Sequence, residues 1–260
     1  MALLETVDLS VTYGGLRAVD GVDITVEEGQ LVGLIGPNGA GKTTFIDALT
    51  GFTPAAGRIN FAGREIGDLP AHRRARIGLG RTWQSLELFD DLNVLENLQV
   101  ASEPQTASGF LLDLVRPGRH RDHGGVDQAL AAVGLEDLAS RMPAELSQGQ
   151  RKLVGVARAL AARPRLVCMD EPAAGLDTSE SEALGDRLRG VVASGVTIFL
   201  VDHDMGLVLS VCDYVYVIEF GQVIASGKPE AVRVDERVIG AYLGAQATRD
   251  IQAPPVQGAT

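Results

Sequence analysis

The amino-acid sequence predicts an α/β fold, with a strand-rich core into which a helical subdomain is inserted. Short apolar runs typical of buried strands occur at residues 31–35, 166–169 and 197–201. Between the first two of these runs, helical patterns predominate. A glycine-rich loop leads from the first buried strand directly into a helix, as it does in α/β proteins.

The length and composition are those of an ordinary globular protein with a sizeable core. The chain has 260 residues, of which 45% are hydrophobic and 22% are charged. Its net charge of −11 disfavours a general nucleic-acid binder, because such a protein needs a basic surface to neutralise phosphates. Two cysteines, Cys168 and Cys212, are too few for a disulfide framework or a metal cluster. Since Cys168 lies in an apolar run, we expect a buried thiol in a reducing, cytosolic compartment.

No segment approaches the roughly 18 consecutive apolar residues that a membrane-spanning helix needs. The N-terminus reaches Glu5 without a basic region, so no signal peptide is expected. The sequence therefore predicts a chain that does not span a membrane by itself, but that could dock onto a protein that does.

Local patterns predict the other elements in order. Alternating apolar residues indicate strands at 3–9 and 22–26, with a turn at Gly14-Gly15 between them. Residues 58–61 are typical of an edge strand, and a hairpin is expected to turn at Phe220-Gly221 between strands 214–219 and 222–225. Amphipathic patterns predict helices at 42–49, 92–100, 126–133, 148–162 and 178–188. Residues 246–260 contain Pro254-Pro255 and few bulky side chains, so we expect a disordered tail there.

Residues 36–43 read GPNGAGKT and match the phosphate-binding pattern G-x-x-x-x-G-K-[ST] at every fixed position. Glycines let backbone N–H groups surround phosphate oxygens, and the helix N-terminus adds partial positive charge. Lys42 can reach the β- and γ-phosphates, and the Thr43 hydroxyl can ligate Mg²⁺. The alternative is a glycine-rich turn that merely caps a helix, which the strand before the loop and the helix after it disfavour. The motif predicts binding of a nucleoside triphosphate without specifying the reaction.

A second motif, LVCMDE at 166–171, is a buried strand that ends in two carboxylates. Ligands of open α/β sheets bind at the carboxyl ends of the strands. Asp170 is therefore a candidate to hold Mg²⁺ through water, and Glu171 is a candidate to polarise an attacking water. Without the phosphate loop, a solvent-exposed acid pair would be the favoured interpretation.

The segment LSQGQ at 146–150 precedes an amphipathic helix. Ser147, with Gln150 three residues later, forms a capping-box pattern, and the same glycine-containing helix N-terminus is a potential anion site. The two interpretations are compatible, because Ser147 has no phosphate to contact until a second surface supplies one.

In combination, these residues resemble an ABC-type ATPase. The phosphate loop, Gln84, LSQGQ, LVCMDE, the residues AGLD at 174–177 and His203 occur in the order of that family, and the resemblance covers residues 1 to about 244. Several segments are more narrowly similar to the ATP-binding subunit of branched-chain amino acid importers: TYGGLRAVDGV, GLGRTWQSLELFDDLNVLENLQVA, DEPAAGLD, VDHDM and GKPEAVRVDERVIGAYLG.

The resemblance implies a fold and a domain division. The ABC ATPase domain would cover residues 1–245, with a P-loop NTPase (RecA-like) core at about 1–85 and 160–245. An antiparallel β subdomain would belong to this core, and the inserted helical subdomain would cover about 88–160.

The resemblance also implies roles for single residues. Tyr13 would stack on adenine, although a tyrosine in a turn is the alternative. Gln84 would contact Mg²⁺ and the attacking water, and His203 would contact the γ-phosphate. Asp177 would lie at a dimer interface, or would simply begin the helix that follows it.

Collected by role, the implied site residues form four sets. The nucleotide-binding set is Tyr13, Gly36, Pro37, Asn38, Gly39, Ala40, Gly41, Lys42, Thr43 and Thr44. The catalytic set is Glu171, His203 and Gln84, and the metal ligands are Thr43, Gln84 and Asp170. The signature set, which would contact nucleotide held by the opposite subunit, is Ser147, Gln148, Gly149 and Gln150.

Two positions depart from the family pattern. Gln148 stands where many ABC ATPases have glycine, and Trp83 stands where phenylalanine is more usual. Neither departure removes a phosphate-contacting group, so a competent site is still expected. A basic cluster at 116–123 could face anionic lipid or a partner, but a solvated loop is the favoured interpretation; it comprises Arg116, Arg119, His120, Arg121 and His123.

The function implied is that of a transport ATPase that uses ATP and Mg²⁺ peripherally at the cytoplasmic face of the cell membrane. Its expected partners are permease membrane subunits, a second homologous ATPase subunit or a second copy of itself, and indirectly an external solute-binding protein, but no nucleic acid. Residues 81–97, which mix apolar groups with acids, are expected to dock the membrane subunit. Branched-chain amino acids are the expected cargo, with other amino acids, urea or amides as alternatives.

Two other classes of function are less favoured. A non-transport ABC ATPase of DNA repair would carry a long insertion between Thr43 and Leu146, and one of translation would carry two cassettes, whereas this chain has one phosphate loop. A nucleotide-binding module without hydrolysis is disfavoured because Glu171 and His203 are intact.

Overall fold

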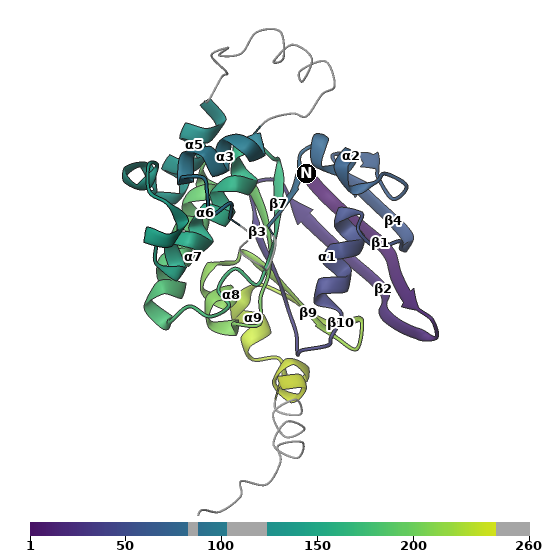
Figure 1. The fold of residues 1–260 in the computed structure, drawn as a ribbon. Coiled ribbons are helices and arrows are strands. Elements are labelled where there is room, and N and C mark those ends of the chain that lie inside the picture. Colours follow the sequence, from purple (N-terminus) through teal and green to yellow (C-terminus); the bar gives the residue numbers. More distant parts are fainter. Residues whose placement is uncertain (83–87, 103–123, 243–260) are drawn as a thin grey trace, which may run out of the picture.

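The computed structural model describes residues 1–82, 88–102 and 124–242, which form two sheets and the helices that cover them (Figure 1). One sheet is antiparallel, with the strand order β2-β1-β4-β5. The other has six strands in the order β10-β9-β3-β8-β7-β6, and all of its neighbouring pairs are parallel except β9 with β10.

The described elements have the following bounds. The strands are β1 (Ala2–Tyr13), β2 (Leu16–Glu27), β3 (Leu31–Ile35), β4 (Ala56–Phe61), β5 (Arg64–Glu65), β6 (Leu79–Arg81), β7 (Leu166–Asp170), β8 (Thr197–Val201), β9 (Tyr214–Glu219) and β10 (Gln222–Gly227). The helices are α1 (Lys42–Thr50), α2 (Ala71–Arg76), α3 (Val94–Ser102), α5 (Gly124–Val133), α6 (Gln148–Ala161), α7 (Thr178–Ala193), α8 (Met205–Val211) and α9 (Pro229–Arg233). Residues 236–242 are also helical.

The central strands β3, β7 and β8 are buried along their whole length, which explains why their sequences are continuously apolar. Successive side chains point to opposite faces of the sheet. In β8, Ile198 and Leu200 pack in the cluster on the helical side, whereas Phe199 and Val201 pack in the cluster on the other side. A two-residue period is therefore present in these strands, although the sequence does not reveal it.

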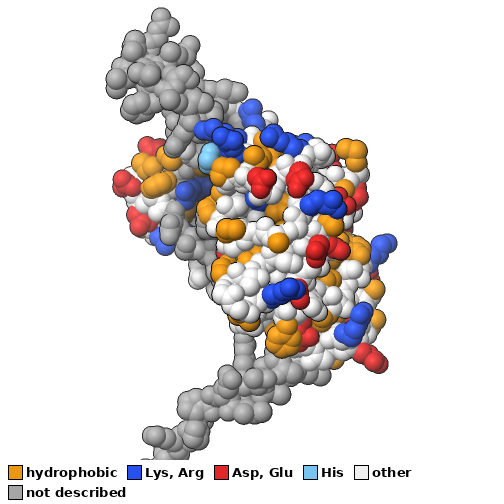
Figure 2. Space-filling view, turned by 90° about the vertical axis from the view of Figure 1, so that its right-hand side faces the viewer, with side chains coloured by type: hydrophobic (Ala, Val, Ile, Leu, Met, Phe, Trp, Pro, Cys, Tyr) orange, Lys and Arg blue, Asp and Glu red, His pale blue; other side chains and the backbone are white. Residues whose placement is uncertain are grey.

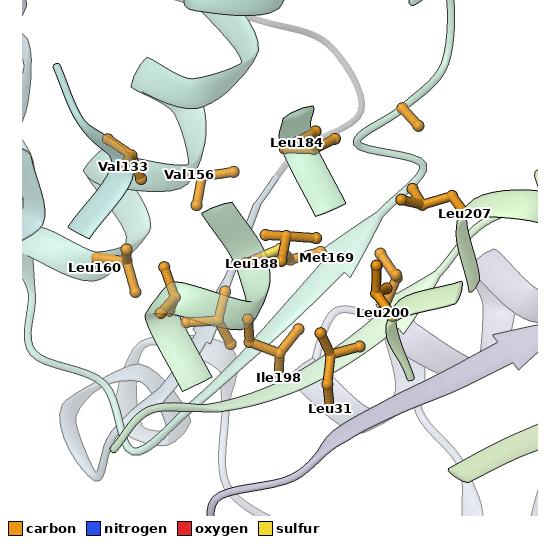
Figure 3. Packing of buried hydrophobic residues seen from close by; sticks show 14 of the residues in the cluster. Leu31, Val133, Val156, Leu160, Met169, Leu184, Leu188, Ile198, Leu200 and Leu207 are labelled. Carbon is orange, nitrogen blue, oxygen red and sulfur yellow. The ribbon is translucent and has the colours of Figure 1, made fainter. Parts of the chain in front are cut away.

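Helices α5, α6 and α7 cover one face of the six-stranded sheet. Figure 3 shows Val133, Val156, Leu160 and Leu188 from these helices directed toward Ile198 of β8 and its neighbours. The buried side chains of these helices therefore pack on the face of the sheet that α6, the helix after the signature turn, covers.

Helix α1 and the antiparallel sheet cover the opposite face. Phe45 of α1 is buried and its ring centroid lies 5.9 Å from that of Phe199 in β8. Figure 2 shows the side of the molecule where the antiparallel sheet lies, with basic, acidic and apolar side chains interspersed. The position of α1 between two sheets matters for function, because the predicted phosphate loop is the segment that leads into it.

The predicted elements in the described residues are present, but several bounds differ. Strands β1 and β2 are longer than predicted because register shifts interrupt the apolar alternation near Leu9 and Val11. The predicted helix at 92–100 begins instead at Val94, since the Asn93 side chain accepts a hydrogen bond from the Glu96 N–H. Helices α2, α8 and α9 and strand β6 were not predicted; each is only three to seven residues long.

Of the remaining predictions from the sequence, some are tested by the structure and others fall outside the residues that it describes. Cys168 is buried as predicted. Among the described residues, no helix combines the length and the apolar character needed to cross a bilayer. The predicted tail at 246–260, the basic cluster at 116–123, and Trp83 and Gln84 lie outside the described residues. The division into core and helical subdomain stays a prediction.

Candidate nucleotide-binding site

Parallel pairing brings the predicted site residues to one edge of the six-stranded sheet. Strands β3, β8, β7 and β6 are neighbours in that order, so their carboxyl ends meet at the same edge. Gly36 follows β3, Asp202 and His203 follow β8, and Glu171 follows β7. Gly36 and His203 are 167 positions apart in the sequence, and the sheet order makes them neighbours at this edge.

The phosphate loop has a backbone that only glycine accommodates at some positions. Gly41 has a φ of 106°, and a Cβ there would lie 2.3 Å from the carbonyl oxygen of Ala18. At Gly36, a Cβ would lie 2.1 Å from the carbonyl oxygen of Ile218. Gly41 also occupies the N-cap of α1, where no side chain accepts a hydrogen bond from the first turn. The N-terminal amides of α1 are therefore available to an anion.

Lys42 is folded back over the loop that precedes it. Its Nζ donates hydrogen bonds to the carbonyl oxygens of Gly36, at 2.7 Å, and Pro37, at 3.0 Å. Burial lowers the pKa of Lys42, and the carboxylates of Glu171 and Asp170 oppose that shift. A buried cation that bonds only neutral carbonyls can exchange them for phosphate oxygens, which make stronger charge-assisted hydrogen bonds.

Asp170 at the end of β7 has an unusual hydrogen-bonding state. Its side chain is 2% exposed, and Oδ2 lies 3.4 Å from Nη2 of Arg81. Oδ1 is buried and has no hydrogen-bond partner within the described part of the chain. Burial raises the pKa of Asp170, and the charge of Arg81 acts in the opposite direction. A buried carboxylate oxygen without a partner is a position that a hard cation or its bound water would satisfy.

Glu171 occupies a strained turn directly after β7. Its φ of 48° lies in the left-handed region, which is costly for a residue other than glycine. The turn is held by a hydrogen bond of 2.7 Å from the Glu171 N–H to the carbonyl oxygen of Val201 in β8. Nδ1 of His203 lies 3.5 Å from Oε1 of Glu171, and the imidazole is 50% exposed. The two predicted catalytic side chains therefore face each other at the edge of the sheet.

Asp202 is a residue of this edge that sequence reasoning missed. It is fully buried and accepts hydrogen bonds from the backbone N–H groups of Ala173, His203 and Asp204. Burial raises the pKa of Asp202, and these N–H groups oppose the shift. The carboxylate ties the turn after β7 to the turn after β8. Its position beside His203 was the only signal in the sequence.

Lys152 was also missed, because it falls on a helix that otherwise looks amphipathic. The side chain is buried, and Nζ lies 3.5 Å from the carbonyl oxygen of Glu171. Burial lowers the pKa of Lys152, while Asp202 and Glu171 oppose the shift. Helix α6 thus reaches the same carboxylates that the phosphate loop faces.

The predicted capping box at the start of α6 is confirmed. Ser147 Oγ accepts a hydrogen bond from the Gln150 N–H, and Gln150 Oε1 accepts one from the Ser147 N–H. The Gln148 side chain lies against Gly175, where a Cβ would be 2.8 Å from Nε2. Gly175 has no Cβ and a φ of 78°, so it leaves room for the side chain of Gln148, the residue that departs from the pattern of the resemblance.

Asp177 and Tyr13 lie in the positions expected from the sequence elements. Asp177 caps α7 by accepting a hydrogen bond of 2.8 Å from the Glu180 N–H, which confirms the helix-capping alternative. Tyr13 ends β1, and its hydroxyl lies 3.3 Å from that of Thr53. About half of the Tyr13 side chain is exposed, so a face of the ring is available for stacking.

This chain is similar in sequence to known proteins whose descriptions agree with a nucleotide-binding site. Residues 19–174 match the family described as ABC transporter, and residues 222–248 match the one described as branched-chain amino acid ATP-binding cassette transporter. The high-affinity branched-chain amino acid transport ATP-binding protein BraF of Pseudomonas aeruginosa is 41% identical over 93% of this chain and 98% of its own length. The corresponding protein LivG of Escherichia coli is 37% identical over the same shares.

A solved structure matches as well. The ADP conformation of an ATP-binding cassette of an ABC transporter superposes with a TM-score of 0.83 and 31% identity, covering 94% of this chain and 99% of that one. The fold and the glycine-rich loop define an α/β nucleotide-binding protein of the P-loop class. More narrowly, the chain belongs to the ABC transporter family, as one of its ATP-binding cassette ATPases.

Proposed function

We propose that this chain is the ATP-hydrolysing subunit of an importer for branched-chain amino acids. The observation that carries the proposal is the similarity to BraF and LivG, both described as branched-chain amino acid transport ATP-binding proteins, over nearly the whole chain. The match of residues 222–248 to a C-terminal family of the same description supports it independently.

In this proposal the phosphate loop and α1 bind the triphosphate. Lys42 would release the carbonyls of Gly36 and Pro37 and bond the β- and γ-phosphates instead, next to the N-terminal amides of α1. Tyr13 would stack on the adenine. The contributing loop residues are Gly36, Pro37, Asn38, Gly39, Ala40, Gly41, Thr43 and Thr44.

Mg²⁺ fits the same edge. Oδ1 of Asp170, which has no partner among the described residues, and the hydroxyl of Thr43 are oxygen ligands of the kind Mg²⁺ prefers, and Gln84 is the third proposed ligand. The described residues contain no group of three or more His, Cys, Asp or Glu side chains that could hold a metal ion. Most of the coordination would therefore come from phosphate oxygens and water. The ion would neutralise charge that develops on the phosphates.

Glu171 is the proposed general base. The strained turn holds its carboxylate at the sheet edge, where it can accept a proton from a water molecule. His203, which faces Glu171 and is half exposed, would contact the γ-phosphate. Asp202 accepts hydrogen bonds from the N–H groups of His203 and Asp204 and from that of Ala173 after β7, and these bonds would hold the turn of His203 relative to the base.

The exposed signature turn requires a partner in this proposal. Ser147, Gln148, Gly149 and Gln150 would complete an ATP site on a second cassette, either another copy or a homologous subunit. The assembly would be bound peripherally to permease subunits at the cytoplasmic face of the membrane, and a solute-binding protein outside would deliver the amino acid.

The experiment is uptake into proteoliposomes. The chain is reconstituted with candidate permease subunits and a candidate solute-binding protein from the same organism, with ATP supplied on the side of the cassette. We expect ATP-dependent uptake of radiolabelled leucine, isoleucine and valine, and no uptake without ATP. Uptake of urea or an amide in place of leucine would overturn the proposed cargo but not the proposed ATPase activity. Absence of ATP hydrolysis would overturn both proposals.

A further inference from the structure

The guanidinium of Arg81 connects two elements that carry proposed Mg²⁺ ligands. Arg81 is the last residue of β6, and its side chain is 7% exposed. Nη1 lies 2.5 Å from Oδ1 of Asp47 and 3.1 Å from Oγ1 of Thr50, both in α1. Nη2 lies 3.4 Å from Oδ2 of Asp170 at the end of β7. The group is also stacked on Phe52, with 5.6 Å to the ring centroid.

These contacts join the segments from which the ligands would come. Helix α1 carries Thr43 in its first turn, one turn before Asp47. Strand β7 ends at Asp170, and β6 leads to Gln84, which follows Arg81 by three positions. One buried side chain thus ties the Thr43 helix and the Asp170 strand to the strand that precedes Gln84.

The contacts also divide the roles of the two oxygens of Asp170. Arg81 occupies Oδ2, whereas Oδ1 is the oxygen that lacks a partner in the described residues. A guanidinium presents several N–H donors in a fixed plane, so it can bond Asp47 and Asp170 simultaneously and set the orientation of both. A lysine ammonium, which is a point charge, would not fix that orientation.

We propose that Arg81 is a positioning residue for the Mg²⁺ of the bound nucleotide. By bonding Oδ2 of Asp170 and Asp47 of α1, it sets the separation of the Asp170 and Thr43 ligands and leaves Oδ1 for the ion. The inference rests on the proposed function, because the ligand roles of Thr43, Asp170 and Gln84 belong to it. The competing explanation is that Arg81 only stabilises the fold by compensating the buried carboxylate of Asp170 and the partly buried one of Asp47.

The test measures how Mg²⁺ changes nucleotide affinity. The purified full chain is titrated with a fluorescent, non-hydrolysable ATP analogue in EDTA and then at increasing Mg²⁺ concentrations. Loss of a group that orients a metal ligand typically costs ten- to a hundredfold in metal affinity. For Arg81→Met we expect the half-saturating Mg²⁺ concentration to rise at least about tenfold, with affinity in EDTA within about twofold of wild type. Arg81→Lys should recover only part of the loss.

Two further variants keep the test decisive. Arg58→Met removes an exposed arginine on β4 and should leave both affinities unchanged. Asp47→Asn retains Arg81 and Asp170 but weakens the bond to α1, so it should raise the half-saturating Mg²⁺ concentration even if Arg81→Met fails to fold. A wild-type Mg²⁺ response in folded Arg81→Met, or in Asp47→Asn when Arg81→Met does not fold, would overturn the inference alone. Absence of nucleotide binding by the wild type would overturn the proposed function.

Discussion

At the carboxyl edge of the six-stranded sheet, which we call the nucleotide edge, buried and partly buried carboxylates lie close to buried cations. Asp170 lies beside Arg81, and both Lys42 and Lys152 lie in the field of Glu171. Burying such groups is tolerable only when charges are paired and hydrogen-bonded, because an isolated buried charge is expensive. The edge is thus pre-arranged for a ligand that brings both negative charge and a cation, as Mg-ATP does.

Lys42→Ala should remove the cation that faces the β- and γ-phosphates. We expect ATP hydrolysis by the assembled transporter to fall by about a hundredfold or more, since preorganised electrostatic contacts of this kind are worth that much. The measurement is phosphate release at saturating Mg-ATP, with a thermal melt as control because Lys42 also bonds Gly36 and Pro37. Near-normal turnover would exclude the phosphate-loop role of this lysine.

Glu171→Gln should separate binding from hydrolysis. The amide keeps the shape of the side chain but cannot accept a proton from water, so hydrolysis should fall about a hundredfold or more while nucleotide affinity changes little. Equilibrium binding and single-turnover hydrolysis measure the two effects. Rapid hydrolysis by this variant would assign the base role to another group.

At the scale of single elements, the proposed function gives one residue at the N-terminus of α6 two purposes. Ser147 caps the helix through the Gln150 N–H, yet it remains exposed. Substitutions at this position therefore risk confusing a loss of the cap, worth about 1 kcal/mol, with a loss of contact to the opposite nucleotide.

Ser147→Asp avoids that ambiguity, because aspartate is as good an N-cap as serine. It places a negative charge where a phosphate of the opposite site would lie. We expect the isolated chain to bind nucleotide and melt as the wild type does, whereas hydrolysis by the assembled transporter is strongly impaired. Ser147→Thr, which keeps both the cap and the hydroxyl, should retain activity. If Ser147→Asp instead abolished nucleotide binding by the isolated chain, the contact would not be made to the opposite subunit.

The second half of the predicted docking segment is organised around one asparagine. Asn97 of α3 is fully buried and donates to the carbonyl oxygens of Phe89, Leu92 and Asn93, while its own oxygen accepts from the Phe89 N–H. This bonding holds Phe89 43% exposed, with the Arg158 guanidinium 5.3 Å from its ring centroid. Phe89 therefore does not pack in the core, and its exposed ring forms an apolar surface next to the charge of Arg158.

Phe89→Ala should therefore weaken coupling to the permease and not the fold. We expect lost transport and lost co-purification with the permease, with the ATPase activity of the isolated subunit retained. Val234→Ala, which removes an exposed apolar side chain after α9, is the matched control and should transport normally. A lowered melting temperature with intact co-purification would instead show that Phe89 serves to pack the junction between α3 and α6.

At the scale of the whole molecule, the proposed function needs two cassettes, because each ATP site would take its phosphate loop from one and its signature turn from the other. The phosphate loop follows β3 at the carboxyl edge of the six-stranded sheet, whereas the signature turn precedes helix α6. Within the chain, the Gln148 side chain of the signature turn packs on Gly175, and Ser147 and Gln148 are exposed. A second cassette would complete both halves.

Glu171→Gln with Mg-ATP should therefore form dimers if the chain pairs with itself. Size-exclusion chromatography with light scattering should show the mass of a monomer without nucleotide and of a dimer with Mg-ATP, because trapped γ-phosphate retains both signature contacts. The double variant with Lys42→Ala should remain monomeric. A monomer at saturating nucleotide would indicate that the partner is a different ATPase subunit.

The sequence determined the elements and the chemistry on which the fold is built. The glycine-rich loop, the acidic end of β7 and the capping box at Ser147 each follow from local rules about backbone, charge and helix ends, so they could be recognised without coordinates. The buried strands could also be recognised from local sequence. Their apolar runs record burial on both faces.

The tertiary structure decided which of these pieces meet. Lys152 and Arg81 gave no signal of their own, and Asp202 gave only its position beside His203, because their roles arise from groups on other strands and helices. Short elements such as β6 and α8 have too few residues to show a period, so packing defines them and not propensity. Sequence rules act over a few residues, whereas the charge balance of the nucleotide edge depends on the order in which parallel strands pair.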